Sequence, residues 1–145
     1  NGISHAEEID KNSEIFQIWF DPDLKKSLQK EASYDDYKSE VFKKMSSKNK
    51  TIKFIVGKNS PMKMDTEGIL INEYKLNKGE HTLKISSESI HSFFLHEGSL
   101  KYKENLIKKG TFFKVENTNK ISFEGIENSK IFEIISPQMP SYKIY

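Results

Sequence analysis

From Thr51 to Ile135 the chain alternates short apolar runs with turn residues, and the runs recur at intervals of about 8 to 12 residues, as in an all-β sandwich or barrel. Gly98 and Gly110 lie between runs, where turns need a positive φ. We therefore expect a small antiparallel barrel, closed so that few strand edges are exposed. The predicted strands are Thr51–Val56, Ile69–Leu76, His81–Ile85, His91–His96, Ser99–Lys103, Thr111–Val115, Lys120–Phe123 and Lys130–Ile135.

The centre of this pattern is the stretch Ile90–Val115, which predicts two hairpins and a further strand with no helix between them. Within it, Leu100 and Tyr102 share one face of their strand because side chains alternate with a period of two. The aromatic residues of this half of the chain are most simply core, although rings at a barrel mouth could also bind a flat ligand. They are Phe93, Phe94, Phe112, Phe113, Phe123 and Phe132.

Before the barrel, Ser13–Phe20 is a strongly apolar run with apolar residues on both faces. It predicts a strand that is covered on both sides. This strand either adds to the barrel or pairs with a second copy, and because an unpaired apolar edge invites association we expect a homodimer. The following Asp21-Pro22-Asp23 ends the strand.

The segment Leu24–Met45 has two interpretations. Tyr34, Tyr37, Val41 and Met45 fall at helical spacing, with Asp21 and Pro22 as N-cap and first helical residue. Alternatively, the segment is an irregular arm that lays aromatic side chains across the barrel. A lysine-rich bridge, Ser46–Lys50, precedes the barrel, and the tail Gln138–Tyr145 contains two tyrosines that predict docking.

Composition narrows the function classes. The 145 residues suffice for one domain with an extension, and a net charge of +2 gives no electrostatic case for nucleic acid or an anionic membrane. No apolar run approaches the roughly 18 residues of a membrane helix. The absence of cysteine excludes disulfides and thiolate chemistry and is compatible with a cytoplasmic protein. Because the chain begins at Asn1 without a methionine, we expect it to be a processed or truncated product.

The order of hairpins in Ile90–Val115, followed by KISFEG and by a last apolar strand that ends in Pro137, resembles the C-terminal cupin barrel of the pirin family. The N-terminal residues are more specific. Gly2-Ile3-Ser4-His5-Ala6-Glu7 and Phe16-Gln17-Ile18-Trp19 are similar to the G-I-x-H-x-E and (L/F)-Q-(I/L)-W motifs that close the N-terminal barrel of that family.

The resemblance implies a bicupin architecture with a cupin-like double-stranded β-helix (jelly roll). Residues 1–50 are then the remnant of the N-terminal cupin domain with a partly helical or irregular arm, 51–137 the C-terminal cupin domain, and 138–145 a tail. It also implies an iron-like metal in the N-terminal barrel. His5 and Glu7 match two ligands, whereas the H-x-H pair that supplies the others would precede Asn1. From this chain alone we expect no tightly bound metal.

His5 and Glu7 are two residues apart, so on a strand their side chains share a face, and an imidazole with a carboxylate suits iron(II). The other histidines share no ligand spacing, and we expect one of His81, His91 and His96 to point into the barrel and the others to face solvent. Carboxylates that could do acid–base work show no common pocket and are expected in turns or on the surface. They are Glu97, Glu104, Glu124 and Glu133.

Three functions remain open. The resemblance implies a metal-dependent protein in its complete form, either a dioxygenase that acts on flavonols such as quercetin or a redox-sensing transcriptional cofactor. The second interpretation is a non-catalytic cupin domain that serves as an interaction or regulatory module with a protein partner. The third is a small-molecule binder that uses the barrel mouth. The sequence shows no G-x-S-x-G, phosphate loop or H-E-x-x-H motif, so a hydrolase, a nucleotide-binding protein and a zinc protease lack support.

Overall fold

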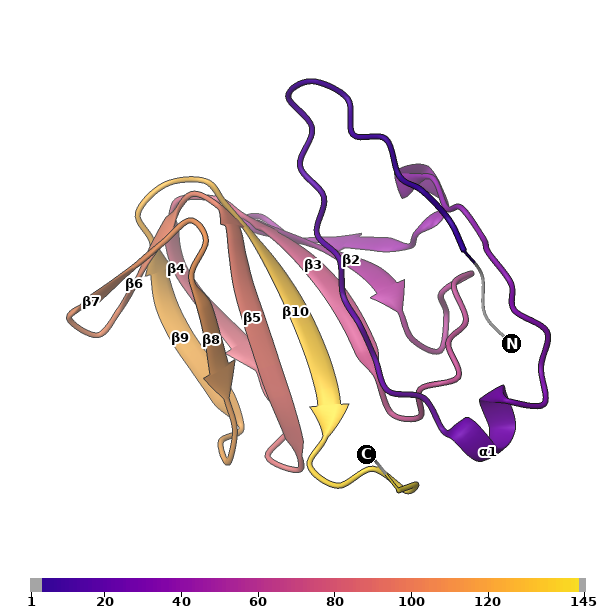
Figure 1. Cartoon of the computed structure of the whole chain (residues 1–145). Coiled ribbons are helices and arrows are strands. Elements are labelled where there is room, and N and C mark those ends of the chain that lie inside the picture. The colour runs from indigo at the N-terminus through magenta and orange to yellow at the C-terminus, as the bar shows by residue number, and fades with distance from the viewer. Residues whose placement is uncertain (1–3, 144–145) are drawn as a thin grey trace.

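The computed structural model describes residues 4–143 and confirms the antiparallel all-β prediction (Figure 1). A six-stranded sheet has the order β1-β2-β3-β10-β5-β8, and a four-stranded sheet has the order β4-β9-β6-β7. The strands are β1 Lys44–Ser46, β2 Lys50–Val56, β3 Leu70–Leu76, β4 Gly79–Lys84, β5 Ser89–Glu97, β6 Ser99–Tyr102, β7 Asn105–Lys108, β8 Phe112–Val115, β9 Lys120–Gly125 and β10 Ser129–Pro137.

All eight strands predicted after Thr51 are present, with ends shifted by a few residues. Two short strands were missed. β1 lies in the segment that the helical pattern had covered, and β7 has mostly exposed side chains, so its apolar alternation is weak. β6 and β7 form a hairpin through a turn at Lys103, which adopts a positive φ of 54°.

The core lies between the two sheets and comes from alternate residues of their strands. Phe93 and Leu95 of β5, Leu100 of β6 and Ile131 of β10 are completely buried. Burial of each such side chain contributes about 1.5–3 kcal/mol, so this face of the strands sets their register. Of the predicted aromatic core, Phe93 and Phe123 are buried. Phe112, by contrast, is 61% exposed.

The N-terminal arm, residues 4–43, departs from the sequence predictions. The predicted strand Ser13–Phe20 is wrong, because these residues form no ladder with any described strand. Their apolar side chains are also not covered on both sides, since Trp19 is 85% exposed and Ile15 is 51% exposed. Association of two copies through this segment stays a prediction, because a single chain does not test it.

Of the two interpretations of Leu24–Met45, helix or irregular arm, the structure shows a mostly irregular arm with short helical turns. A single α-helical turn, α1 (Leu24–Ser27), follows Asp23, whose side chain accepts a hydrogen bond from the backbone N–H of Lys25. Asp23, and not Asp21, is therefore the N-cap. A 3₁₀ turn, η1 (Ser39–Val41), comes later, and neither element buries a side chain, so no packed face extends them. No helix among residues 4–143 is long and apolar enough to cross a bilayer.

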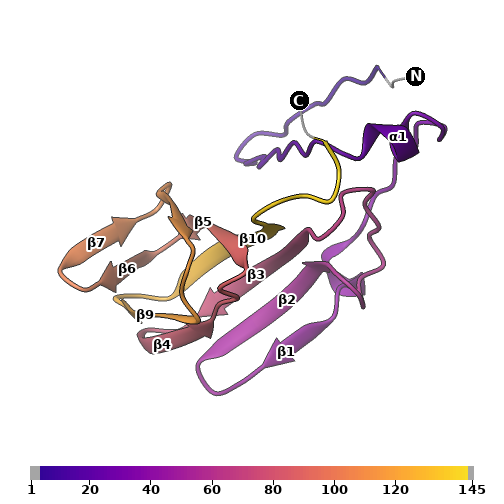
Figure 2. The same ribbon diagram turned by 90° about the horizontal axis from the view of Figure 1, so that it is seen from below.

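The C-terminal tail docks on the arm, as its tyrosines predicted. The Tyr142 hydroxyl donates a hydrogen bond to the Asp21 carbonyl at 2.8 Å. Figure 2 shows the arm and the tail together on one side of the six-stranded sheet. Tyr145 lies outside the described residues.

Gly98 occupies the corner where the chain leaves β5 and enters β6 on the other sheet. Its φ is +83°, and a Cβ there would lie 2.5 Å from the Asn128 carbonyl oxygen and also against the Ser129 hydroxyl. Gly110 has a similar φ of +86° but open space around the Cβ position. The two glycines therefore separate the cost of backbone conformation from the cost of a steric clash.

We predict that Gly98→Ala lowers the free energy of unfolding by at least about 1 kcal/mol more than Gly110→Ala does, because only the first adds a clash to the strained φ. Urea unfolding followed by circular dichroism measures both values. Equal losses for the two variants would show that the β5–β6 corner is not as closely packed as described.

Candidate functional site

His5 and Glu7 lie together on the exposed arm. His5 Nε2 is 3.6 Å from a Glu7 carboxylate oxygen, and the two side chains are 59% and 52% exposed. The spacing thus brings the two predicted ligands to one side of the backbone, although the segment is not a strand. Gly2 and Ile3 of the same motif lie outside the described residues.

The donors of this pair suit iron(II) in kind but not in number. An imidazole and a carboxylate are two of the ligand types that iron favours. Among residues 4–143, however, no three His, Asp or Glu side chains are grouped so that they could hold a metal ion. Within the described residues, His5 and Glu7 are thus two candidate ligands with no third one beside them.

Aromatic and ionic contacts attach the arm to the outer face of the six-stranded sheet. Phe16 stacks on Phe94 at a centroid distance of 4.8 Å and meets Phe132 edge-on at 5.3 Å. Beside it, Lys109 donates to the Glu14 carboxylate at 2.9 Å, and this hydrogen bond and the lysine charge lower the Glu14 pKa. Phe94 and Phe132 were predicted to lie in the core. They instead lie on the outer face of the sheet, where they pack against Phe16 of the arm.

Two of the three remaining histidines are buried, whereas the sequence predicted that only one of them points into the barrel. His81 is 3% exposed and its Nε2 lies 2.7 Å from the Asn77 carbonyl oxygen, while its Nδ1 has no partner within the described part of the chain. His91 is 2% exposed. Only His96, with a side chain 34% exposed, reaches the surface, where it faces Glu14 and Glu97.

The most unexpected site is a buried carboxylate inside the barrel. Glu133 of β10 is 1% exposed, which corrects its predicted surface position. One carboxylate oxygen lies 2.8 Å from Nδ1 of His91 in β5. The other accepts hydrogen bonds from the Tyr74 hydroxyl at 2.7 Å and from Nδ2 of Asn72 at 2.8 Å, both in β3.

Backbone geometry assigns the proton of the His91 ring. The Ser86 backbone N–H donates to His91 Nε2 at 3.0 Å, so Nε2 carries a lone pair. Nδ1 then carries the proton and donates a hydrogen bond to the Glu133 carboxylate. The Glu133 carboxylate therefore accepts three hydrogen bonds, which is what a buried acceptor requires to offset its lost hydration.

The same burial acts on Tyr74. Desolvation, followed by the negative charge of Glu133, raises the Tyr74 pKa well above its ordinary value. Its phenol therefore remains a donor to Glu133. Because the donors to Glu133 come from β3 and β5, these side chains hold three strands together.

The sequence carried a signal for this network. Ile131, Glu133 and Ile135 alternate on β10, so the carboxylate falls on the inward face between two isoleucines. His91 likewise falls in phase with the buried Phe93 and Leu95. Applied to Glu133, the strand period of two therefore predicts a buried carboxylate, which the spacing between carboxylates does not.

We predict that Tyr74→Phe flattens the loss of stability at high pH. A folded-state pKa above the unfolded value of about 10 means that the folded protein retains a proton which the unfolded chain releases, so stability falls as the pH rises above about 10. The free energy of unfolding, measured from pH 8 to 11, should fall less steeply in Tyr74→Phe. Tyr34→Phe, at an 81% exposed position, should follow the parent protein. Parallel curves for all three proteins would contradict the assignment.

Comparison with known proteins identifies the fold. No known family pattern and no curated sequence matches the chain. Among solved structures it is similar to quercetin 2,3-dioxygenase from Acinetobacter baumannii, with a TM-score of 0.62 and 15% identity, over 72% of this chain and 39% of that one. Ectoine synthase from P. lautus has a TM-score of 0.55 at 12% identity, covering 74% and 80% of the two chains.

An RmlC-like cupin from Shewanella frigidimarina has a TM-score of 0.54 at 13% identity, covering 72% of this chain and 92% of the other. This chain spans well under half the length of the quercetin dioxygenase that it matches. At such identities the similarity concerns architecture alone, and it shows that the chain has a cupin fold.

Proposed function

We propose that the chain is the C-terminal barrel of a pirin-like protein, together with an arm that supplies part of a metal site in the complete protein. The observation that carries this proposal is the pair His5 and Glu7, 3.6 Å apart on the arm. Both match the family motif, and both lie outside this chain's own barrel. Phe16 packs the arm against the barrel, and His5 and Glu7 remain exposed on the arm. They are therefore accessible to a neighbouring domain of the complete protein.

Within this chain the barrel itself is a supporting domain. Its interior His91 and Glu133 bind one another, and a cluster of buried apolar side chains packs between the sheets. Iron(II) held by imidazole and carboxylate ligands is suited to oxygen-dependent oxidation, as in a quercetin dioxygenase-type reaction of the complete, cytoplasmic protein. The chain by itself is expected to be inactive.

A second candidate function is a non-catalytic interaction module, and the arm carries the observation that favours it. Trp19 and Tyr34 are 85% and 81% exposed, and Ile15 is 51% exposed, which is unusual for large apolar side chains. A protein partner or a second copy of the chain that packed on Ser13–Phe20 would cover part of this surface. The homodimer predicted from the sequence belongs to this proposal.

The test of the first proposal is the metal content of the complete protein with and without the two ligands. We predict that His5→Ala and Glu7→Ala each lower bound iron about 10-fold or more, since loss of one ligand from a four-ligand set weakens the site severely. Elemental analysis after gel filtration measures the iron, and oxygen consumption with quercetin measures the activity.

Glu8→Ala is the matched control, because it removes a neighbouring exposed carboxylate that the motif does not include. It should retain the metal. If His5→Ala and Glu7→Ala keep their iron as Glu8→Ala does, the two residues are not ligands and the proposal is wrong. An iron-loaded protein that consumes no oxygen with quercetin would leave the ligands in place and reject the dioxygenase activity.

A further inference from the structure

The six-stranded sheet extends beyond the four-stranded one, and its inner face is uncovered there. β1 and β2 lie at the end of the larger sheet, whereas the smaller sheet stops at β4 (Figure 2). Strand register places Phe54 of β2 opposite Asn72 of β3, and Asn72 opposite the buried Glu133. Paired residues of antiparallel strands share a face, so Phe54 and Asn72 face the same side as the barrel interior.

This uncovered face forms an open groove of about 430 Å³. Apolar side chains of Met45, Phe54 and Leu70 line it, with Asn72 at its inner end. Its volume falls in the range of about 300–1,000 Å³ that is usual for small-molecule sites. Phe54 and the sulfur of Met45 are suited to contact with an aromatic ring.

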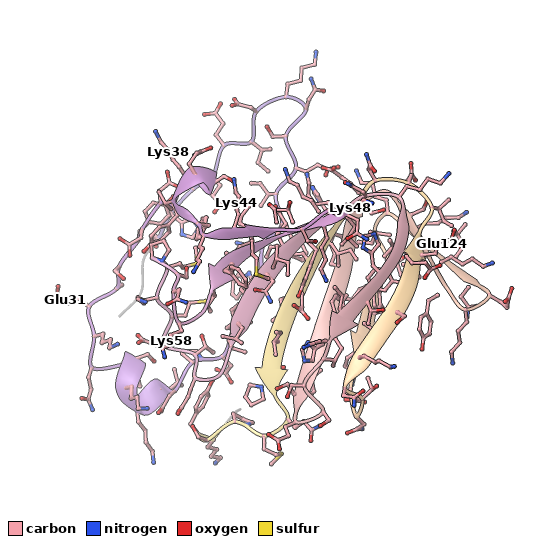
Figure 3. The ribbon with its side chains drawn as sticks, turned by 180° about the vertical axis from the view of Figure 1, so that it is seen from behind. Glu31, Lys38, Lys44, Lys48, Lys58 and Glu124 are labelled. Carbon is pink, nitrogen blue, oxygen red and sulfur yellow. The ribbon has the colours of Figure 1, made fainter. Side chains whose placement is uncertain are left out.

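The charges around the groove are all of one sign. Lys43 and Lys58 line it, and no Asp or Glu does. Figure 3 shows Lys58 at this end of the molecule, on the side away from Glu124. No ion pair joins Lys43 or Lys58 to a described carboxylate. Lys53 lies on the other face of β2, where it is paired with Glu73 at 3.0 Å, and its register partner Lys44 shares that face.

The polarity of the groove orients a ligand. Its inner end touches Asn72, which donates to the Glu133 carboxylate, so negative charge lies behind that end. An anionic group is therefore disfavoured at the inner end and favoured at the lysine rim, while a neutral ring fits between Phe54, Met45 and Leu70.

We propose that this groove binds a small aromatic carboxylic acid, with the ring against the apolar wall and the carboxylate between Lys43 and Lys58. The site shares no residue with the metal half-site on the arm. It is therefore independent of the proposed function, and each can fail without the other.

The test is a titration of the ¹⁵N-labelled chain with cinnamate, and with cinnamamide as an uncharged probe of the same shape, followed by two-dimensional NMR. Cinnamate should shift the amide signals of residues 44, 45, 54, 58, 70 and 72, and cinnamamide should bind more weakly. Lys43→Gln and Lys58→Gln should each weaken cinnamate binding about two- to fivefold, the effect of losing one exposed charge pair.

Lys48→Gln is the matched control, since it removes the same charge from the β1–β2 turn, outside the groove. It should leave the affinity unchanged. Met45→Glu, at a position 55% exposed and so tolerant of substitution, should abolish cinnamate binding by placing a negative charge in the groove. Equal binding of cinnamate and cinnamamide, equal effects of Lys43→Gln and Lys48→Gln, or no shift of the groove signals at millimolar cinnamate would each overturn the proposal.

Discussion

The carboxylate of Glu133 imposes the tightest constraint on this barrel. A carboxylate that is 1% exposed must have its oxygens satisfied within the protein, and here the donors come from both strands that flank β10. Tyr74 and Asn72 belong to β3, and His91 belongs to β5. A shift of either neighbour by one residue would turn these donors to the outer face and leave the charge unpaired. The polar network therefore fixes a register that the surrounding isoleucines and phenylalanines would specify less sharply.

The two faces of the six-stranded sheet make different contacts. The inner face holds the core and the network, and where the smaller sheet ends it opens into a groove lined by apolar side chains and lysines. The outer face receives the arm through Phe16, Phe94 and Phe132. In this arrangement the arm leaves the groove open and presents His5 and Glu7 away from the barrel interior.

The barrel was predictable from the sequence because a period of two, interrupted by glycine and asparagine, has few other structural solutions. Leu100 and Tyr102, for example, share a face as expected, and the Gly98 corner adopts the positive φ that its position indicated. The arm was not predictable in this way. The run Ser13–Phe20 has the composition of a strand, but no described strand offers it an edge. The spacing from Tyr34 to Met45 fits a helix, but no surface packs against it.

The network escaped prediction for a different reason. Sequence spacing places Glu133 on the inward face of β10, but it does not reveal that Tyr74 and His91 lie on either side of it, about 59 and 42 residues earlier in the chain. Such partners become neighbours only through strand order. The pairing of β10 between β3 and β5, which connects distant parts of the sequence, was the information that the residues alone lacked.

The most direct test of the network is the protonation of the His91 ring, observed in a long-range ¹H–¹⁵N spectrum of the folded chain near neutral pH. The structure predicts a proton on Nδ1, shared with Glu133, and a bare Nε2 that accepts from the Ser86 N–H. A proton found on Nε2, or on both ring nitrogens, would mean that the hydrogen bonds which join β3, β10 and β5 are not those described.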